Sequence, residues 1–164
     1  MQKTDIEWTN LRKALTDYGN LFCENARQKL QENNSNATFT LSDSIKLSSV
    51  EITDDYFKVY VEIEDYWQFL EYGRGPGKFP PVDKIEEWVE RKPVQPYPDV
   101  NGKTPTVQQL SFLIGRKIAE QGTTPNPFFE IAKEETWRQM EESIYQAIEQ
   151  DITNHIESVI GNIK

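Results

Sequence analysis

The sequence predicts an α+β fold in which helices at both ends of the chain flank a short stretch of strands. Apolar residues recur every three or four positions near the start and the end of the chain, which is the period of a helix with one packed face. Over residues 37–64 the period changes to two, which is typical of strands. We therefore expect a single domain over 1–164, with a small antiparallel sheet and a long C-terminal helix packed on the sheet and the first helix.

The first helix is expected over residues 4–33. Thr4 and Glu7 have the spacing of a capping box, in which each side chain bonds to an amide of the first turn. Gly19 lies inside this helix, where glycine costs about 1 kcal/mol relative to alanine, so it indicates either a kink or close packing. The apolar stripe consists of Leu11, Leu15, Tyr18, Phe22, Ala26 and Leu30.

Strands are expected over residues 37–64. Ala37, Phe39 and Leu41 alternate with polar residues, and a second alternating pattern predicts an antiparallel hairpin over 49–63 with its turn at 54–55. The outward face of this hairpin carries Tyr56 and Tyr60, and it either meets water or receives another subunit.

Residues 65–81 combine five large apolar or aromatic side chains with a glycine-rich, doubly basic loop. The aromatic positions run from Tyr66 to Tyr72, and the loop at 73–78 contains Arg74 and Lys78 and leads into Phe79. Exposed aromatic side chains would indicate a partner, whereas buried ones would hold the loop rigidly against a core.

A helical insertion is expected over residues 82–122, with one helix at about 82–92 and another at about 105–121. The second helix begins either at the Thr104–Pro105 pair or at a capping box of Thr106 and Gln109, and Gly122 ends it. The last helix is expected over 127–163, roughly 55 Å at 1.5 Å per residue. Part of its stripe should pack on the first helix, and the rest should bend or project toward another molecule.

Composition limits the classes of function. The formal net charge of −9 opposes binding to nucleic acid or to an anionic membrane, and one cysteine, Cys23, excludes an internal disulfide framework. No apolar run has the roughly 20 residues of a spanning helix, and we expect no secretory signal. We expect a soluble protein that is made in a cytoplasm.

No catalytic, cofactor-binding or metal-binding constellation is expected. The loop at 73–78 has the wrong spacing for a phosphate-binding loop, lacks the Ser or Thr after Lys78, and loses one amide to Pro76. His155 is the only histidine and is expected at a solvated or interface edge. Glu62 and Glu64 share a strand face without a calcium-loop pattern. The acidic residues of the last helix, Asp151 among them, are interpreted as a solvated face.

The order of these features resembles the tail-completion family of tailed bacteriophages, also described as head–tail joining, neck or minor tail proteins. Three short segments carry the resemblance. They are Leu41-Ser42-Asp43-Ser44-Ile45, the tyrosine-rich stretch from Tyr66 and Trp67 to Glu71-Tyr72-Gly73, and Asn126-Pro127-Phe128-Phe129 ahead of Ala132. The chain departs from the family at Arg74, where threonine is usual, and at Asn126, where arginine is usual, and its insertion at 82–122 is larger than in a minimal member.

The resemblance implies a small α+β protein that forms a ring, hexameric or dodecameric, at the head–tail interface of a virion. It would contact portal or connector proteins and tail proteins, let DNA pass through its lumen without sequence-specific binding, and be assembled in the host bacterial cytoplasm without any membrane. One alternative is another phage assembly factor, such as a tail-terminator or portal-associated ring protein. The other is a nucleotide-binding enzyme that uses the 73–78 loop.

The resemblance also suggests roles for individual residues. It places the aromatic segment at a transition from core to loop, so we expect these aromatics to pack under the hairpin and helices. The expected core residues of the motifs are Leu41, Ile45, Tyr66, Trp67, Glu71, Gly73, Pro127, Phe128 and Phe129. The expected interface residues are Arg74, Lys78, Phe79, Tyr56 and Tyr60, with Arg74 and Lys78 meeting a carboxylate of a neighbouring subunit.

Overall fold

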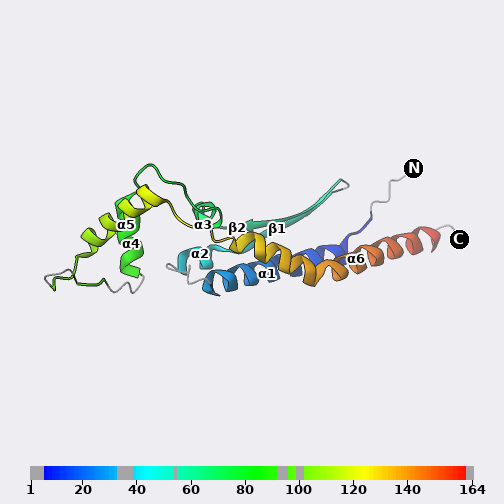
Figure 1. Cartoon of the computed structure of the whole chain (residues 1–164). Helices are drawn as coiled ribbons and strands as arrows, with labels where there is room; N and C mark the ends of the chain where they lie inside the picture. Colours follow the sequence, from blue (N-terminus) through cyan, green and yellow to red (C-terminus); the bar gives the residue numbers. More distant parts are fainter. Residues whose placement is uncertain (1–5, 33–38, 54, 92–95, 99–101, 162–164) are drawn as a thin grey trace. The chain divides into compact units, whose positions relative to one another are not determined.

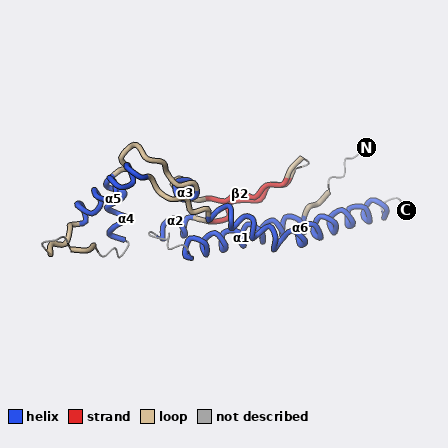
Figure 2. Tube along the Cα trace, viewed as in Figure 1, coloured by secondary structure: helices blue, strands red, loops and turns tan. Residues whose placement is uncertain are grey.

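A computed structural model describes residues 6–32, 39–53, 55–91, 96–98 and 102–161 of the chain. These residues form six helices and a two-stranded antiparallel sheet (Figures 1 and 2). The predicted α+β class is confirmed. Contacts group the chain into two compact units, and each is described by itself. The first unit draws on Met1–Lys29, Ser44–Ile63 and Phe129–Lys164, and the second on Leu30–Asp43 and Glu64–Phe128.

Two long helices lie side by side in the first unit (Figure 1). Helix α1 spans Thr9–Glu32 and helix α6 spans Phe128–Gly161. They run antiparallel, because the start of α1 contacts the last third of α6 and Lys29 near the end of α1 pairs with Glu135 near the start of α6. Their core is formed by Leu11, Ala14, Leu15 and Ile144, with Trp8, Tyr18, Val50, Ile52, Val59, Met140, Ala147 and Ile148 packed against it.

The predicted stripe of the first helix is confirmed, because all of its members except Tyr18 are at most 8% exposed. The predicted last helix is confirmed as well. At 34 residues α6 is roughly 50 Å long, and its expected extension to residues 162–163 lies outside the described residues. No helix among the described residues is long and apolar enough to cross a membrane.

The sheet consists of β1 (Lys46–Ile52) and β2 (Phe57–Glu62), which confirms the predicted hairpin and extends it toward the N-terminus. A register shift between Leu47 and Ser49 inserts one residue into β1. This bulge puts Leu47 on the same face as Val50, three positions later, and that face packs on the helices. The sheet lies close to α1 at Gly19, where an added Cβ would lie 2.6 Å from the Leu47 side chain and 3.0 Å from that of Val59. Close packing therefore explains this glycine.

The expected strand at residues 37–41 is wrong where the structure describes it, because Phe39–Ser44 forms the short helix α2. Ala37 lies outside the described residues. Leu41, Ser42 and Ile45 are all buried, and their spacing of one and four positions is that of a helix face rather than of a strand. Three alternating residues were too short a pattern to distinguish the two periods.

The second unit contains α3 (Trp67–Glu71), α4 (Val82–Arg91) and α5 (Val107–Gln121). Helix α5 begins at the predicted capping box of Thr106 and Gln109, and Gly122 ends it as expected. Helices α4 and α5 pack against one another. They meet at Gly115 of α5, where an added Cβ would lie 2.6 Å from the ring of Phe79 and 3.2 Å from Ile85.

The expectation that the aromatic segment is buried is wrong for three of its side chains. Tyr66, Phe69 and Tyr72 are 41%, 63% and 70% exposed, while Trp67 is half-buried and lies 6.3 Å from the ring of Tyr72. The reason is the short helix α3. A helix of five residues has room on its inward face for only part of a cluster this dense, so the remaining side chains point to solvent.

Candidate assembly surfaces

The loop at 73–78 is fixed by backbone hydrogen bonds to the last turn of α5 and to the segment that follows it. The amide of Arg74 donates to the carbonyl of Thr123 at 3.2 Å, the amide of Thr123 donates back at 2.7 Å, and the amide of Gly77 donates to the carbonyl of Ala119 at 2.8 Å. Amides that are committed to carbonyls cannot hold a phosphate, and Pro76 has none. The geometry therefore disfavours an anion-binding role for this loop.

Gly73 and Gly122 make this close backbone approach possible. Both have positive φ, +68° and +75°, a region that side chains with a Cβ disfavour. An added Cβ on Gly73 would lie 2.4 Å from the carbonyl oxygen of Thr123, and one on Gly122 would lie 2.0 Å from that of Arg74. The structure thus explains why Gly73 of the resemblance motif is glycine, and the same explanation applies to Gly122.

The three loop residues expected at an interface differ in their availability. The guanidinium of Arg74 donates to the carbonyl of Lys78 within its own loop, so this side chain is already engaged. The Lys78 side chain is exposed. Phe79 is half-buried and packs on Phe112 of α5, with ring centroids 5.5 Å apart. Of the three, only Lys78 is presented to solvent as the sequence suggested.

The two hairpin residues expected at an interface are exposed and held by one carboxylate. The hydroxyls of Tyr60 and Tyr56 donate to Glu51 at 2.7 and 2.9 Å, and the Lys58 amine lies 3.9 Å from the centre of the Tyr56 ring. The hydrogen bonds from Tyr60 and Tyr56 lower the pKa of Glu51, and the same bonds raise the pKa of each tyrosine. This outer face is thus a preorganised patch in which two aromatic rings are 39% and 42% exposed.

The residues that carry the family resemblance are buried at some positions and exposed at others. Leu41, Ile45, Glu71 and Phe128 are at most 4% exposed. Trp67, Gly73 and Phe129 are half-buried, and Phe129 packs edge-on against Phe22 at 4.9 Å. Tyr66 and Pro127 are exposed, so the expected core role is wrong for these two.

Asp151 is buried, although the sequence predicts it on a solvated face. It is 2% exposed, and its carboxyl group accepts hydrogen bonds from the Asn10 amide at 3.1 Å, the Asn10 side chain at 2.7 Å and the Leu11 amide at 2.9 Å. It therefore caps α1 from the last third of α6. The helix begins at Thr9 and not at the expected residue 4, and Thr4 of the expected Thr4–Glu7 capping box lies outside the described residues. The distance of 141 positions between Asn10 and Asp151 left no local signal for this cap.

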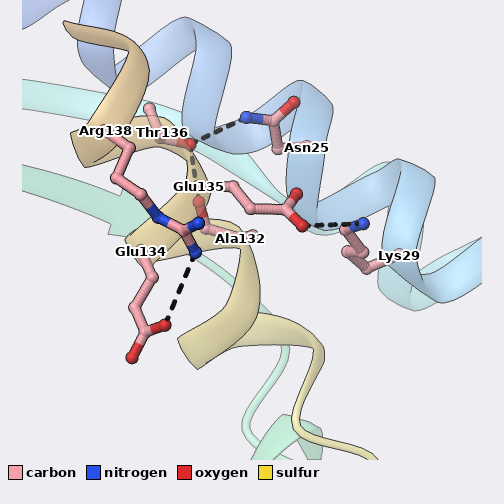
Figure 3. A network of polar contacts seen from close by, with 7 residues as sticks. All are labelled: Asn25, Lys29, Ala132, Glu134, Glu135, Thr136 and Arg138. Carbon is pink, nitrogen blue, oxygen red and sulfur yellow. Dashed lines mark hydrogen bonds and ion pairs between the residues drawn. The ribbon is translucent and has the colours of Figure 1, made fainter.

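A second set of polar contacts fixes the other end of the α1–α6 pair (Figure 3). The hydroxyl of the fully buried Thr136 donates to the carbonyl of Ala132 at 2.6 Å and accepts from the Asn25 side chain at 2.9 Å. Lys29 pairs with Glu135 at 3.1 Å. Polar contacts at both ends thus fix the register of the two helices.

Helix α6 continues its apolar stripe past the start of α1. Beyond Asp151, its four large aliphatic residues are between 37% and 60% exposed. We call these residues, Ile152, Ile156, Val159 and Ile160, the α6 tip. Because α1 begins alongside Asp151, this part of the α6 stripe extends past the start of α1.

No group of three or more histidine, cysteine or acidic side chains among the described residues could hold a metal ion. His155 is half-buried on α6. Cys23 is buried on α1, where desolvation raises the pKa of its thiol and the nearby Arg27 opposes this effect. A thiol with a raised pKa is a poor nucleophile.

Comparison of the chain with protein-family models, with curated proteins and with solved structures found no match.

Proposed function

We propose that this chain is a structural component of the head–tail connector of a tailed bacteriophage. In this role it forms a ring that completes the tail or joins it to the head, and DNA passes through the lumen. The observation that carries the proposal is the α6 tip, where four aliphatic side chains of a regular helix are between 37% and 60% exposed. Such a surface is typical of a protein that buries it on assembly.

The resemblance motifs support the same proposal. Ile45 and Phe128 are fully buried, Glu71 is 2% exposed, and Gly73 has a positive φ with no space for a Cβ. Motif residues at such constrained positions are those on which a fold depends. This is what is expected if the resemblance reflects a shared architecture.

The charge of the chain suits a wall around DNA rather than a DNA-binding surface. Its formal net charge is −9, and α6 carries most of its acidic residues on exposed positions. Repulsion between acidic side chains and phosphates keeps DNA from adhering to a channel. The proposed partners are portal or connector proteins on one side and tail proteins on the other, within a virion assembled in the bacterial cytoplasm.

A nucleotide-binding enzyme is the weaker candidate. Its loop would need free backbone amides, and those of Arg74 and Gly77 are bonded to carbonyls of the chain. Nucleotide binding that Lys78→Ala abolishes would favour this alternative over the proposal.

Negative-stain electron microscopy tests the proposal directly. The purified chain is imaged alone and after mixing with portal and tail proteins of tailed phages. We expect rings with a central opening, formed either by the chain alone or on one of these partners. A chain that stays monomeric in every mixture contradicts the proposal. A ring that binds only the far end of the tail would instead favour a tail-terminator role.

A further inference from the structure

The α6 tip has the shape of a docking element. Asp151 marks the point where α1 begins, so residues 152–161 extend about 15 Å beyond it. The exposed fractions of Ile152, Ile156, Val159 and Ile160 are 38%, 51%, 37% and 60%. Their spacing continues the stripe that is buried at Ile144. The tip is therefore an amphipathic helix end whose apolar side is open.

The charge around the tip restricts what can cover it. From Gln139 to Gly161, α6 contains no lysine or arginine and five acidic residues, of which Asp151 is buried and Glu157 lies within the tip. Laying the same segment of a second molecule alongside would bring like charges together, which is unfavourable at an interface. A symmetric pairing of two tips is therefore disfavoured, and the complementary surface should be apolar with basic residues beside it.

The second unit exposes a surface of this composition on α5. Phe112 and Leu113 are 53% and 43% exposed, and the basic Arg116 and Lys117 follow within one turn. Phe79 packs on Phe112, with ring centroids 5.5 Å apart, and the exposed Lys78 directly precedes Phe79 in the chain. We call this surface the α5 patch, and it consists of Lys78, Phe112, Leu113, Arg116 and Lys117.

The basic residues of the α5 patch are available to a partner. The Arg116 guanidinium lies 3.8 Å from the Glu120 carboxylate, but both side chains are exposed, and a pair of this kind contributes only about 0.3–0.5 kcal/mol. Lys78 and Lys117 form no ion pair among the residues that the structure describes. Neither helix face would lose a strong contact on docking.

We infer that the α6 tip of one molecule docks on the α5 patch of a second copy of this chain. Aliphatic side chains of the tip cover Phe112 and Leu113, and Glu157 meets the basic residues of the patch. The tip and the patch are different surfaces of one chain, so the contact is head-to-tail and generates a ring when the rotation closes. This inference rests on the proposed self-assembly and identifies the surfaces that perform it.

Light scattering coupled to size-exclusion chromatography of the full chain tests the pairing. A tip variant carries Ile156→Gln and Ile160→Gln, and a patch variant carries Leu113→Gln and Lys117→Glu. All four positions are exposed, so each variant should fold like the wild type. Each variant alone should lose self-association by at least about tenfold in the dissociation constant, since burying one aliphatic side chain has an effect of that order. A control with Asn154→Gln and Ser158→Gln, on the opposite side of the same helix, should assemble like the wild type.

Mixing the two variants gives the sharpest result. The intact tip of the patch variant can dock on the intact patch of the tip variant, but no further contact is possible. We therefore expect a one-to-one heterodimer and no larger species. Failure to form it, or wild-type assembly by either variant alone, overturns the inference.

Two further outcomes separate this inference from the proposed function. A wild-type chain that is monomeric alone but forms rings on portal or tail proteins overturns the docking pair and leaves the proposed function standing. Rings that persist in the tip variant likewise overturn the docking pair and leave the proposed function standing. A chain that assembles neither alone nor with those proteins contradicts both the docking pair and the proposed function.

Discussion

Replacing Asp151 with alanine should lower the free energy of unfolding by about 3 kcal/mol. The carboxyl group accepts three hydrogen bonds at 2.7–3.1 Å, two of them from the first-turn amides of Asn10 and Leu11. Loss of a helix cap costs about 1 kcal/mol, and a buried amide left without an acceptor costs about 1–3 kcal/mol more. Asp151→Asn retains the shape but directs an NH₂ group at an amide donor, so it should cost about half as much, roughly 1–2 kcal/mol.

Urea denaturation followed by circular dichroism measures this change, with an unchanged dependence on urea as the sign that only stability has shifted. Glu149→Ala is the matched control, because Glu149 is exposed on the same helix two positions earlier. Amide hydrogen exchange adds a local measurement, since the Leu11 amide should exchange faster in Asp151→Ala than in the control. If Asp151→Ala destabilises the chain no more than Glu149→Ala does, the interpretation of Asp151 as the cap of α1 is refuted.

Three further predictions concern tight or buried positions. Gly73→Ala should destabilise the chain by about 2 kcal/mol or more in a thermal melt, because alanine disfavours a positive φ and its Cβ would meet the carbonyl of Thr123. Gly75→Ala is the control, because no atom lies within 4 Å of an added Cβ there, and this variant should melt like the wild type. Gly19→Ala should also lower the melting temperature, although alanine favours helices by about 1 kcal/mol, because its Cβ would collide with side chains of the sheet; a gain in stability would contradict the proposed close packing. Cys23, which is 3% exposed and has a raised thiol pKa, should react with a thiol reagent only after unfolding; rapid labelling of the native chain would show that α1 opens locally.

The described helices and strands that were predicted correctly are those with strong local signals. The capping box of Thr106 and Gln109 involves residues three positions apart, and Gly122 ends α5 through a bond to Ile118 four positions earlier. The long stripe of α1 repeats often enough to identify its period. In contrast, Phe39 and Leu41 provided too few repeats, and the segment folded as helix α2.

The candidate surfaces were predicted only in part, for a related reason. The composition of the 73–78 loop indicated exposed basic residues, and Lys78 is exposed, but Arg74 is bonded to its own loop. The excess length of the last helix indicated a projecting segment, and the α6 tip is that segment. The α5 patch could not be predicted from the sequence, because exposure on a helix depends on which face its neighbours cover. The packing of Gly115 against Phe79 and Ile85 determines which face of α5 is covered and which face is exposed.

The sequence by itself determined the α+β class, the hairpin and the four longer helices α1, α4, α5 and α6, because periodicity, caps and turns are encoded within a few residues of one another. Only the tertiary structure decided where α1 begins, why Gly19 and Gly73 are glycine, and which apolar side chains remain exposed. Each of these depends on atoms far apart in the chain, as in the bond between Asn10 and Asp151 across 141 positions. A buried carboxyl group and a solvated one have the same letter in the sequence, and only the donors that folding brings to Asp151 distinguish them.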